Sequence, residues 1–217
     1  RLRLQQSLTN MGIAERKARE KAQKRELILA TARQLFLKHG FDAVSLRKIA
    51  DELEYSPGTI YLYFKNKAEL FFAIHQQGFD EFYLRMKSAD TIEHPLERMR
   101  ELGHIYLKFA IDNPEFYDLM FINRMPVSFE EGETGWESGM KTYSCLKETV
   151  AACIEAGHFS YQDVEQTAFY IWTHMHGMAS LLIRDRLTMH GETNVDHLME
   201  ETMRRMLDML VGEGERS

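Results

Sequence analysis

Hydroxyl, amide and ammonium side chains are concentrated between Ser45 and Lys67, and their chemistry suits contacts with phosphate groups. Tyrosine and threonine hydroxyls can donate hydrogen bonds to phosphate oxygens or to the edges of bases. Helix N-termini, expected at Ser45, Ser56 and Asn66, present backbone N–H groups that also suit phosphate oxygens. This stretch is therefore a candidate nucleic-acid-binding surface.

A different chemistry is suggested by two Glu-x-x-His pairs, Glu101 with His104 and Glu155 with His158. Such pairs on facing helices hold the metals of helical di-iron carboxylate proteins, so an enzyme of that kind is an alternative interpretation. Gly157 is expected to end its helix and to leave His158 off the required face. The sequence has no Gly-x-Ser-x-Gly motif and no phosphate-binding glycine loop. We therefore expect no enzyme, no metal site and no cofactor.

The net charge of −6 is distributed unevenly along the chain. Residues 1–67 contain 14 Lys and Arg against 7 Asp and Glu, a net charge of +7, whereas residues 68–217 carry a net −13. Binding of a polyanion is therefore expected in the N-terminal third alone. No apolar run approaches the roughly 18 residues of a membrane span, and no signal peptide opens the chain. We expect a cytoplasmic protein with no membrane contact.

Hydrophobic periodicity indicates helices along almost the whole chain, which predicts an all-α fold of about nine helices. The first helix is expected to follow a basic run over residues 16–25 and to end at Gly40. Capping residues and prolines predict that the later helices begin near Ser45, Ser56, Asn66, Pro95, Pro114, Trp136, Asp163 and Val195.

The two short helices between residues 45 and 64 have the composition of a helix-turn-helix. Ala50 is small enough for the helices to cross closely, and the inward positions are apolar: Ile49, Leu53, Ile60 and Phe64. The second helix then has five residues free on its other sides, which are Pro57, Gly58, Thr59, Tyr61 and Tyr63.

The segment Ser-Pro-Gly-Thr-Ile-Tyr-Leu-Tyr-Phe-Lys-Asn-Lys that ends at Lys67, with Ile49-Ala50 before it and Glu69-Leu70 after it, resembles the DNA-binding domain of TetR-family regulators. The likeness covers about residues 24–87. One departure is Glu54, at a turn position where the family usually has glycine. A left-handed conformation would cost this residue about 1 kcal/mol, unless the turn is remodelled.

The resemblance implies a dimer that binds a palindromic operator in double-stranded DNA and responds to a small effector, most simply as a repressor. An activator of the same family is the alternative, and an architectural DNA-binding protein without a ligand is a third interpretation. Together with the placement above, the resemblance predicts that the residues contacting DNA are Ser45, Arg47, Lys48, Ser56, Pro57, Gly58, Thr59, Tyr61, Tyr63, Lys65 and Lys67.

The expected organisation has three parts. Residues 1–20 form a disordered or basic N-terminal arm, in which residues 1–10 look structureless and Met11 is a candidate start. Residues 21–87 form the DNA-binding domain, with its motif at about 45–65 and a connecting fourth helix. Residues 88–217 form a domain for ligand binding and dimerisation.

The apolar helix over residues 169–183 needs cover on both faces, which predicts a dimer interface shared with the last helix. The pattern Trp172-x-x-x-His176-Gly177 resembles the WHG type of TetR C-terminal domain. The residues expected at the interface are Gly177, Ser180, Leu181, Met203 and Leu210.

Aromatic and methionine side chains are abundant in the C-terminal two thirds of the chain, and such adaptable side chains suit a pocket for an apolar or aromatic effector. They also suit an ordinary core. The expected pocket residues are Tyr106, Phe109, Tyr117, Phe121, Tyr143, Trp172 and His176.

Overall fold

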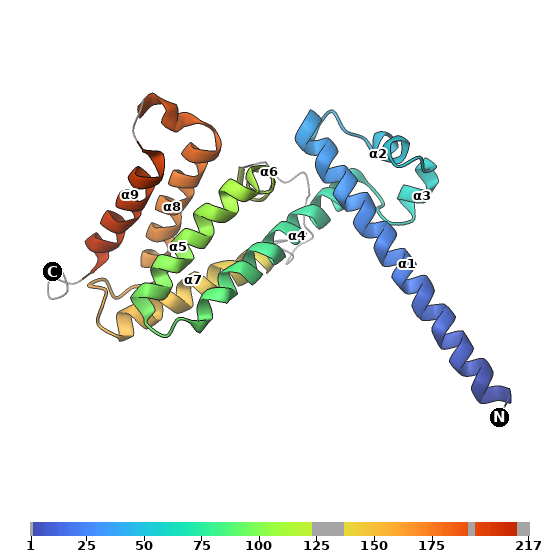
Figure 1. Ribbon diagram of the computed structural model, residues 1–217, viewed down its shortest axis with the longest axis horizontal. Coiled ribbons are helices and arrows are strands. Elements are labelled where there is room, and N and C mark those ends of the chain that lie inside the picture. The colour runs from blue at the N-terminus through green and yellow to red at the C-terminus, as the bar shows by residue number, and fades with distance from the viewer. Residues whose placement is uncertain (1, 123–136, 191–193, 212–217) are drawn as a thin grey trace. The chain divides into compact units, whose positions relative to one another are not determined.

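The computed structural model describes residues 2–122, 137–190 and 194–211 (Figure 1). Over these residues it contains nine α-helices and no strand, with one isolated antiparallel bridge between Phe159 and Val211. The predicted all-α fold is therefore confirmed. Pro126, Gly132 and Gly135 predict a loop in the sequence, and this stretch lies outside the described residues. The chain divides into two compact units, an N-terminal unit up to Ile74 and a C-terminal unit from His75 onwards.

The N-terminal unit consists of α1 (Leu2–His39), α2 (Leu46–Glu52), α3 (Pro57–Tyr61) and the first third of α4 (Lys67–Lys87). The predicted caps are present: the Ser45 hydroxyl accepts a hydrogen bond from the Lys48 N–H at 3.1 Å, and Ser56 caps α3 in the same way. Asn66 caps α4, but Glu69 reaches back to the N–H of Lys65 at 2.7 Å rather than to that of Asn66. The capping box is therefore displaced by one residue.

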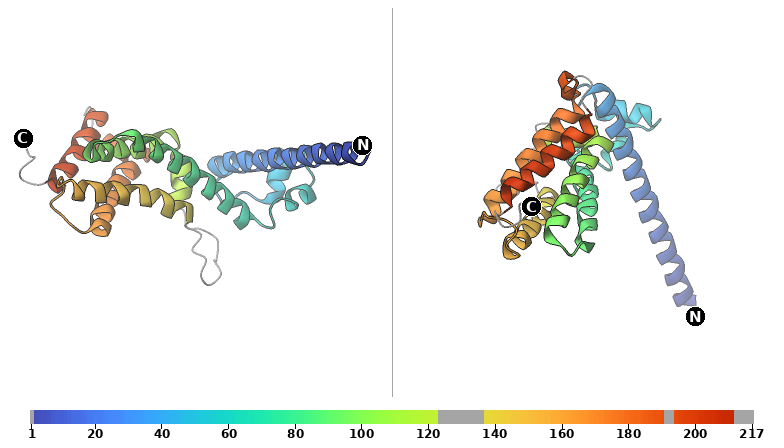
Figure 2. Two further views of the ribbon diagram at one scale, coloured as in Figure 1. Left: turned by 90° about the horizontal axis from the view of Figure 1, so that it is seen from below. Right: turned by 60° about the vertical axis from the view of Figure 1, so that its left-hand side comes forward.

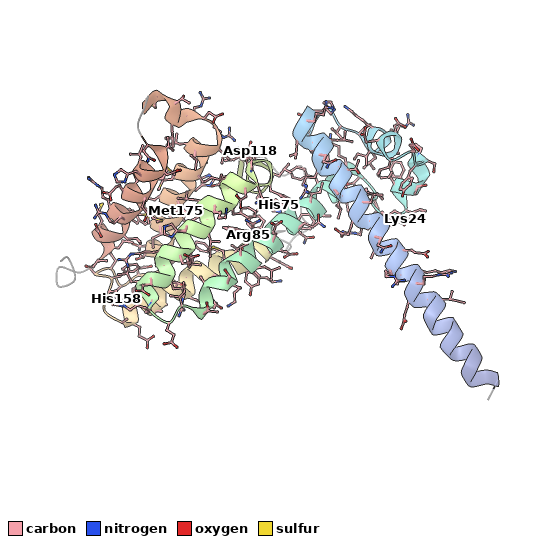
Figure 3. All side chains as sticks on the ribbon, in the orientation of Figure 1. Lys24, His75, Arg85, Asp118, His158 and Met175 are labelled. Atoms are coloured by element: carbon pink, nitrogen blue, oxygen red, sulfur yellow. The ribbon has the colours of Figure 1, made fainter. Side chains whose placement is uncertain are left out.

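Of the two alternatives expected for residues 1–20, a disordered arm and a basic arm, the structure contradicts the disordered one over residues 2–20. These residues continue α1, which runs unbroken from Leu2 to His39. Alanine, arginine, lysine, glutamine and glutamate are strong helix formers and are frequent here, and Arg16 pairs with Glu20 one turn later. Residues 12–24 are all exposed, so they form a solvated basic helix; Figure 3 labels Lys24 on it.

The C-terminal unit is a bundle built from the rest of α4, α5 (Pro95–Asp112), α6 (Pro114–Tyr117), α7 (Glu137–Glu155), α8 (Val164–Ile183) and α9 (Val195–Leu210). Helix α5 packs against both α7 and α8, and α9 lies beside α8 (Figure 2). A π-helical turn, Asp118–Ile122, follows α6, and short 3₁₀ turns occupy Ser88–Thr91 and Arg186–His190.

Left-handed glycines end two of the helices. Gly40 follows α1 and Gly157 follows α7, both with φ of 79°, a conformation that glycine adopts without steric cost. Because α7 ends at Glu155, His158 does not share a helix with that residue. The second Glu-x-x-His pair therefore lacks the helical geometry that a di-iron site requires.

No helix in residues 2–122, 137–190 or 194–211 combines the length and the apolar character needed to cross a membrane.

Candidate DNA-binding surface and ligand cavity

The helix-turn-helix is held together from its inner side. Ile49, Ala50 and Ile60 are fully buried, and the Tyr55 N–H donates to the Ala50 carbonyl at 2.8 Å across the turn. Glu54 adopts the left-handed conformation, with φ of 55°. Of the two alternatives at this position, the strained but family-like turn is the one that forms.

The residues predicted to contact DNA fall into two groups by exposure. The exposed group is Ser45, Arg47, Ser56, Pro57, Gly58, Tyr61 and Lys65, and the half-buried group is Lys48, Thr59, Tyr63 and Lys67. All but Lys67, which begins α4, belong to α2, α3 or the segments that flank these two helices. Leu62, which follows directly after α3, is 77% exposed, and it was not among the residues of the predicted surface.

Lys67 is held in place by an aromatic ring. Its Nζ lies 3.9 Å from the centre of the Phe41 ring, which is the geometry of a cation–π contact. Burial lowers the pKa of Lys67, and the nearby Asp42 carboxylate opposes this effect. The ammonium at the start of α4 is thus positioned before any phosphate arrives.

The C-terminal unit contains an apolar cavity of about 380 Å³ between α4, α5, α7, α8 and α9. Four of the seven predicted pocket residues line it, namely Tyr106, Phe121, Tyr143 and Trp172. Figure 3 labels Met175 on α8, which also lines the cavity. The volume is in the range of sites for small organic ligands.

The other three predicted pocket residues lie behind the cavity wall. Phe109 is fully buried and stacks on Phe82, with ring centres 4.6 Å apart. The Tyr117 hydroxyl shares hydrogen bonds with His176 Nδ1 at 2.6 Å and with the Tyr106 hydroxyl at 2.9 Å. Burial, reinforced by Arg184, lowers the pKa of His176, and burial raises the pKa of Tyr117. This network fixes the orientation of Tyr106 in the wall.

Sequence reasoning missed much of the rest of the wall, including four methionines, a glycine and a carboxylate: Met86, Met99, Met175, Met206, Gly103 and Glu165. The sequence could have indicated Gly103, because a glycine inside a helix lowers the stability of that helix by about 1 kcal/mol and is usually kept there for close packing. A Cβ there would lie 2.5 Å from Met203 Sδ. Nothing in the sequence indicated that Glu165 lines a cavity, since acidic residues are common in the first turn of a helix.

The prediction that Met203 and Leu210 form a dimer interface is wrong. They are only 2% and 4% exposed, because this face of α9 packs inside its own unit, where Met203 lines the cavity. Gly177 and Leu181 are exposed on α8, and Ser180 is half-buried. On α9 the exposed apolar residue is Met209, at 63%.

The described residues contain no group of three or more histidine, cysteine, aspartate and glutamate side chains placed to hold a metal. His104 pairs instead with Glu200 on α9, with 2.9 Å between Nε2 and the carboxylate. Cys145 and Cys153 are both buried as free thiols.

Two family sequence models match the chain. Residues 28–74 match "Bacterial regulatory proteins, tetR family", and residues 99–206 match "Tetracyclin repressor-like, C-terminal domain". An HTH-type transcriptional regulator of Staphylococcus aureus (strain bovine RF122 / ET3-1) is 33% identical over 90 residues, which is 41% of this chain and 49% of that protein. A regulator of strain USA300 is 32% identical over the same shares. The matched part of the chain thus spans about half the length of these curated relatives.

Solved structures share the fold at low sequence identity. The putative regulatory protein SCO4313 has a TM-score of 0.74 and 21% identity, covering 88% of this chain and 98% of that one. The TetR-family regulator PfmR from Thermus thermophilus has a TM-score of 0.68 and 19% identity, over 83% and 97%. The fatty acid degradation regulator FadR from Bacillus halodurans has a TM-score of 0.66 and 18% identity, over 85% and 94%.

Proposed function

Because the chain belongs to the TetR family of bacterial regulatory proteins, we propose that it is a ligand-responsive transcriptional repressor that binds a palindromic operator as a homodimer. The observation that carries this proposal is the coexistence of a helix-turn-helix in one unit with an apolar cavity of about 380 Å³ in the other. A cavity of this size is unfavourable in a tightly packed core unless a ligand occupies it.

The proposed DNA-binding surface is the exposed side of α3 with the start of α2 and of α4. Tyr61 and Thr59 would read base edges in the major groove, whereas Arg47, Lys65 and Lys67 would hold phosphates. The basic face of α1 from Arg16 to Arg25 would add further phosphate contacts. In place of the expected limits of 21–87 and 88–217, we propose that the ligand-binding and dimerisation domain begins at His75 within α4, because Phe79, Phe82 and Met86 line the cavity.

The proposed dimer interface uses the outer faces of α8 and α9. Gly177 and Leu181 are exposed on α8, and the Tyr170 hydroxyl lies 4.0 Å from the sulfur of the exposed Met209 on α9. Exposed apolar side chains on two adjacent helices suit a four-helix interface with a second copy. On α9, the proposed interface residue is Met209 instead of the expected Met203 and Leu210.

The test begins with selection of a bound fragment from genomic or random duplex DNA, followed by binding at several salt concentrations. Lys67→Ala should weaken binding to specific and random DNA alike and lower the salt slope by about one unit. Tyr61→Phe should change sequence preference and leave that slope unchanged. Lys108→Ala, on the exposed surface of α5, is the matched control.

If Lys67→Ala, Tyr61→Ala and Arg47→Ala all bind the selected fragment like the wild type, the proposed surface is wrong. A selected site that overlaps the promoter supports a repressor. A site upstream of the promoter favours an activator instead.

A further inference from the structure

The cavity is apolar except at one end, where the first turn of α8 lies beside the middle of α7. Among the described residues that line it, Glu165 is the one with a charged side chain. This residue lies in the first turn of α8. A ligand in the cavity therefore meets the Glu165 carboxylate at this end, where Lys147 pairs with it.

Aromatic rings surround the same end of the cavity. The Trp172 ring lies between Tyr143 and Phe169, with ring centres 5.8 Å and 6.0 Å apart, and all three residues line the cavity. Phe169 and Met140 are about half exposed, at 55% and 51%, so this end opens to solvent. Ring faces attract cations, most strongly those of tryptophan and tyrosine.

The chain's own ammonium already occupies part of this arrangement. Lys147 Nζ lies 3.2 Å from the Glu165 carboxylate and 5.5 Å from the centre of the Tyr143 ring. Lys147 is not among the cavity-lining residues, so its ammonium approaches from outside the cavity. The Glu165 side chain is 65% exposed, and an ion pair this exposed contributes little and exchanges readily.

We propose, on the basis of the ligand-responsive function argued above, that the effector is a lipophilic cation with one amine or quaternary ammonium head. Its apolar body would lie among Met99, Met175 and Met203, and its head between Glu165 and the aromatic rings, in place of the Lys147 ammonium. A carboxylate head would face Glu165 and be repelled. The net charge of −13 over residues 68–217 also attracts cations to this part of the chain.

Tyr143 adds an uncharged contact at the open end of the cavity, beside Glu165. Its hydroxyl is buried, and this burial together with the neighbouring Glu165 carboxylate raises the pKa of Tyr143 to about 12. The hydroxyl therefore stays protonated at neutral pH. An amine head can donate to its oxygen, which a fully apolar ligand cannot do.

The test compares three probes that share one decyl chain and differ in the head: decyltrimethylammonium, decanol and decanoate. Each is titrated calorimetrically into the full chain below its micelle-forming concentration. The expected order of affinity is ammonium, then alcohol, then carboxylate. Decanoate binding at least as tightly as decyltrimethylammonium would overturn the proposal, as would a failure of all three probes to bind.

Substitutions at Glu165 and Lys147 test whether the preference for an ammonium head arises at the open end of the cavity. Glu165→Gln should weaken decyltrimethylammonium roughly five- to tenfold and leave decanol unchanged, because only the charged head loses its partner. Lys147→Met should tighten the ammonium probe by removing its competitor. Glu148→Gln, at an exposed position on α7 outside the cavity, is the matched control.

Equal losses for the ammonium and the alcohol in Glu165→Gln would mean that Glu165 supports only the cavity wall, and the proposal would fail. The outcomes also separate this proposal from the repressor function. Three probes that bind equally and all release the operator leave the repressor intact and remove only the head-group preference. A chain that binds no duplex DNA refutes the repressor whatever the probes do.

Discussion

At the scale of single residues, a buried histidine makes the stability of the C-terminal unit depend on pH. His75, labelled on α4 in Figure 3, is 1% exposed, and its ring lies 4.9 Å from that of Phe79. Burial lowers the pKa of His75 to about 4, against an opposing effect of the Met120 backbone. The unfolded chain therefore binds more protons than the folded one between pH 6.5 and about 4, so stability falls as the pH falls through this window.

The expected loss from His75 is about 3 kcal/mol at the acid end of that window, and it is absent well above the ordinary histidine pKa of about 6.5. Urea unfolding of His75→Leu should show a shallower loss across this window than the wild type. His39→Gln, at an exposed position, should keep the wild-type profile. Parallel profiles for His75→Leu and the wild type would contradict the assignment.

Two helix glycines in the C-terminal unit should respond differently to the same substitution. A Cβ at Gly78 would lie 2.6 Å from Met120 Sδ and 3.0 Å from the ring of Phe116, a residue that is 5% exposed. Gly78→Ala should destabilise the protein by about 1–2 kcal/mol, since overpacking outweighs the gain in helix propensity. Thermal and urea unfolding would measure this loss.

At Gly103 the nearest atom is the Met203 sulfur, at the flexible end of a side chain that borders the cavity. Gly103→Ala should therefore change stability by less than about 1 kcal/mol, because Met203 can move into empty space. Ligand binding should weaken, since the same movement reduces the cavity. A large loss of stability in Gly103→Ala would show that the wall at this point is rigid.

At the scale of helices, the capping residues correctly predicted where four of the helices begin. Ser45, Ser56, Asn66 and Asp163 each accept the expected backbone hydrogen bond, and the helix starts follow within a residue. Local chemistry sufficed because a cap and the helix it begins are neighbours in sequence. The unbroken α1 was missed because its basic composition was taken as a sign of an arm rather than of helix propensity.

Periodicity could not distinguish an apolar face covered by the same chain from one covered by a partner. Met203 and Met209 lie on the same helix, yet one is 2% and the other 63% exposed. The same difficulty limited the cavity, because aromatic composition located Tyr106 and Trp172 but also selected Phe109, which belongs to the core. Which side chains surround a void depends on tertiary packing, which spacing along one helix does not specify.

A prediction about the dimer follows from the exposed apolar residues of α8 and α9. A Cβ added at Gly177 would have no atom within 4 Å, so Gly177→Leu should leave the subunit folded. The larger side chain should, however, obstruct a close contact between helices across the interface. Met209→Lys should act in the same way. Sedimentation should detect monomers with weakened operator binding, whereas Gly177→Ala should remain dimeric. A wild-type monomer at micromolar concentration would refute the interface.

At the scale of the whole molecule, α4 is the element that belongs to both units. Its first turns carry Lys67 and also Phe71, which packs against Phe36 and Phe41, whereas Phe79 and Phe82 further along line the cavity. A ligand that displaces Phe79 or Phe82 therefore acts on the same helix that begins at a proposed phosphate contact. We expect a tilt of α4 to change the spacing of the two recognition helices in the dimer.

The final prediction is that effector and operator weaken each other's binding by the same factor. The ligand must prefer the conformation that does not fit the operator, so by linkage the operator must lower the affinity for the ligand equally. A coupling of about 1–3 kcal/mol corresponds to a roughly 5- to 150-fold loss of operator affinity at saturating ligand.

The decyl probes and further aromatic and long-chain apolar compounds are first ranked by thermal stabilisation. Each hit is then titrated with and without operator. A compound whose affinity is the same in both titrations fills the cavity without being an effector, because a ligand with equal affinity for both states shifts neither. If every hit behaves in this way, the ligand-sensing part of the proposal fails and the DNA-binding part stands.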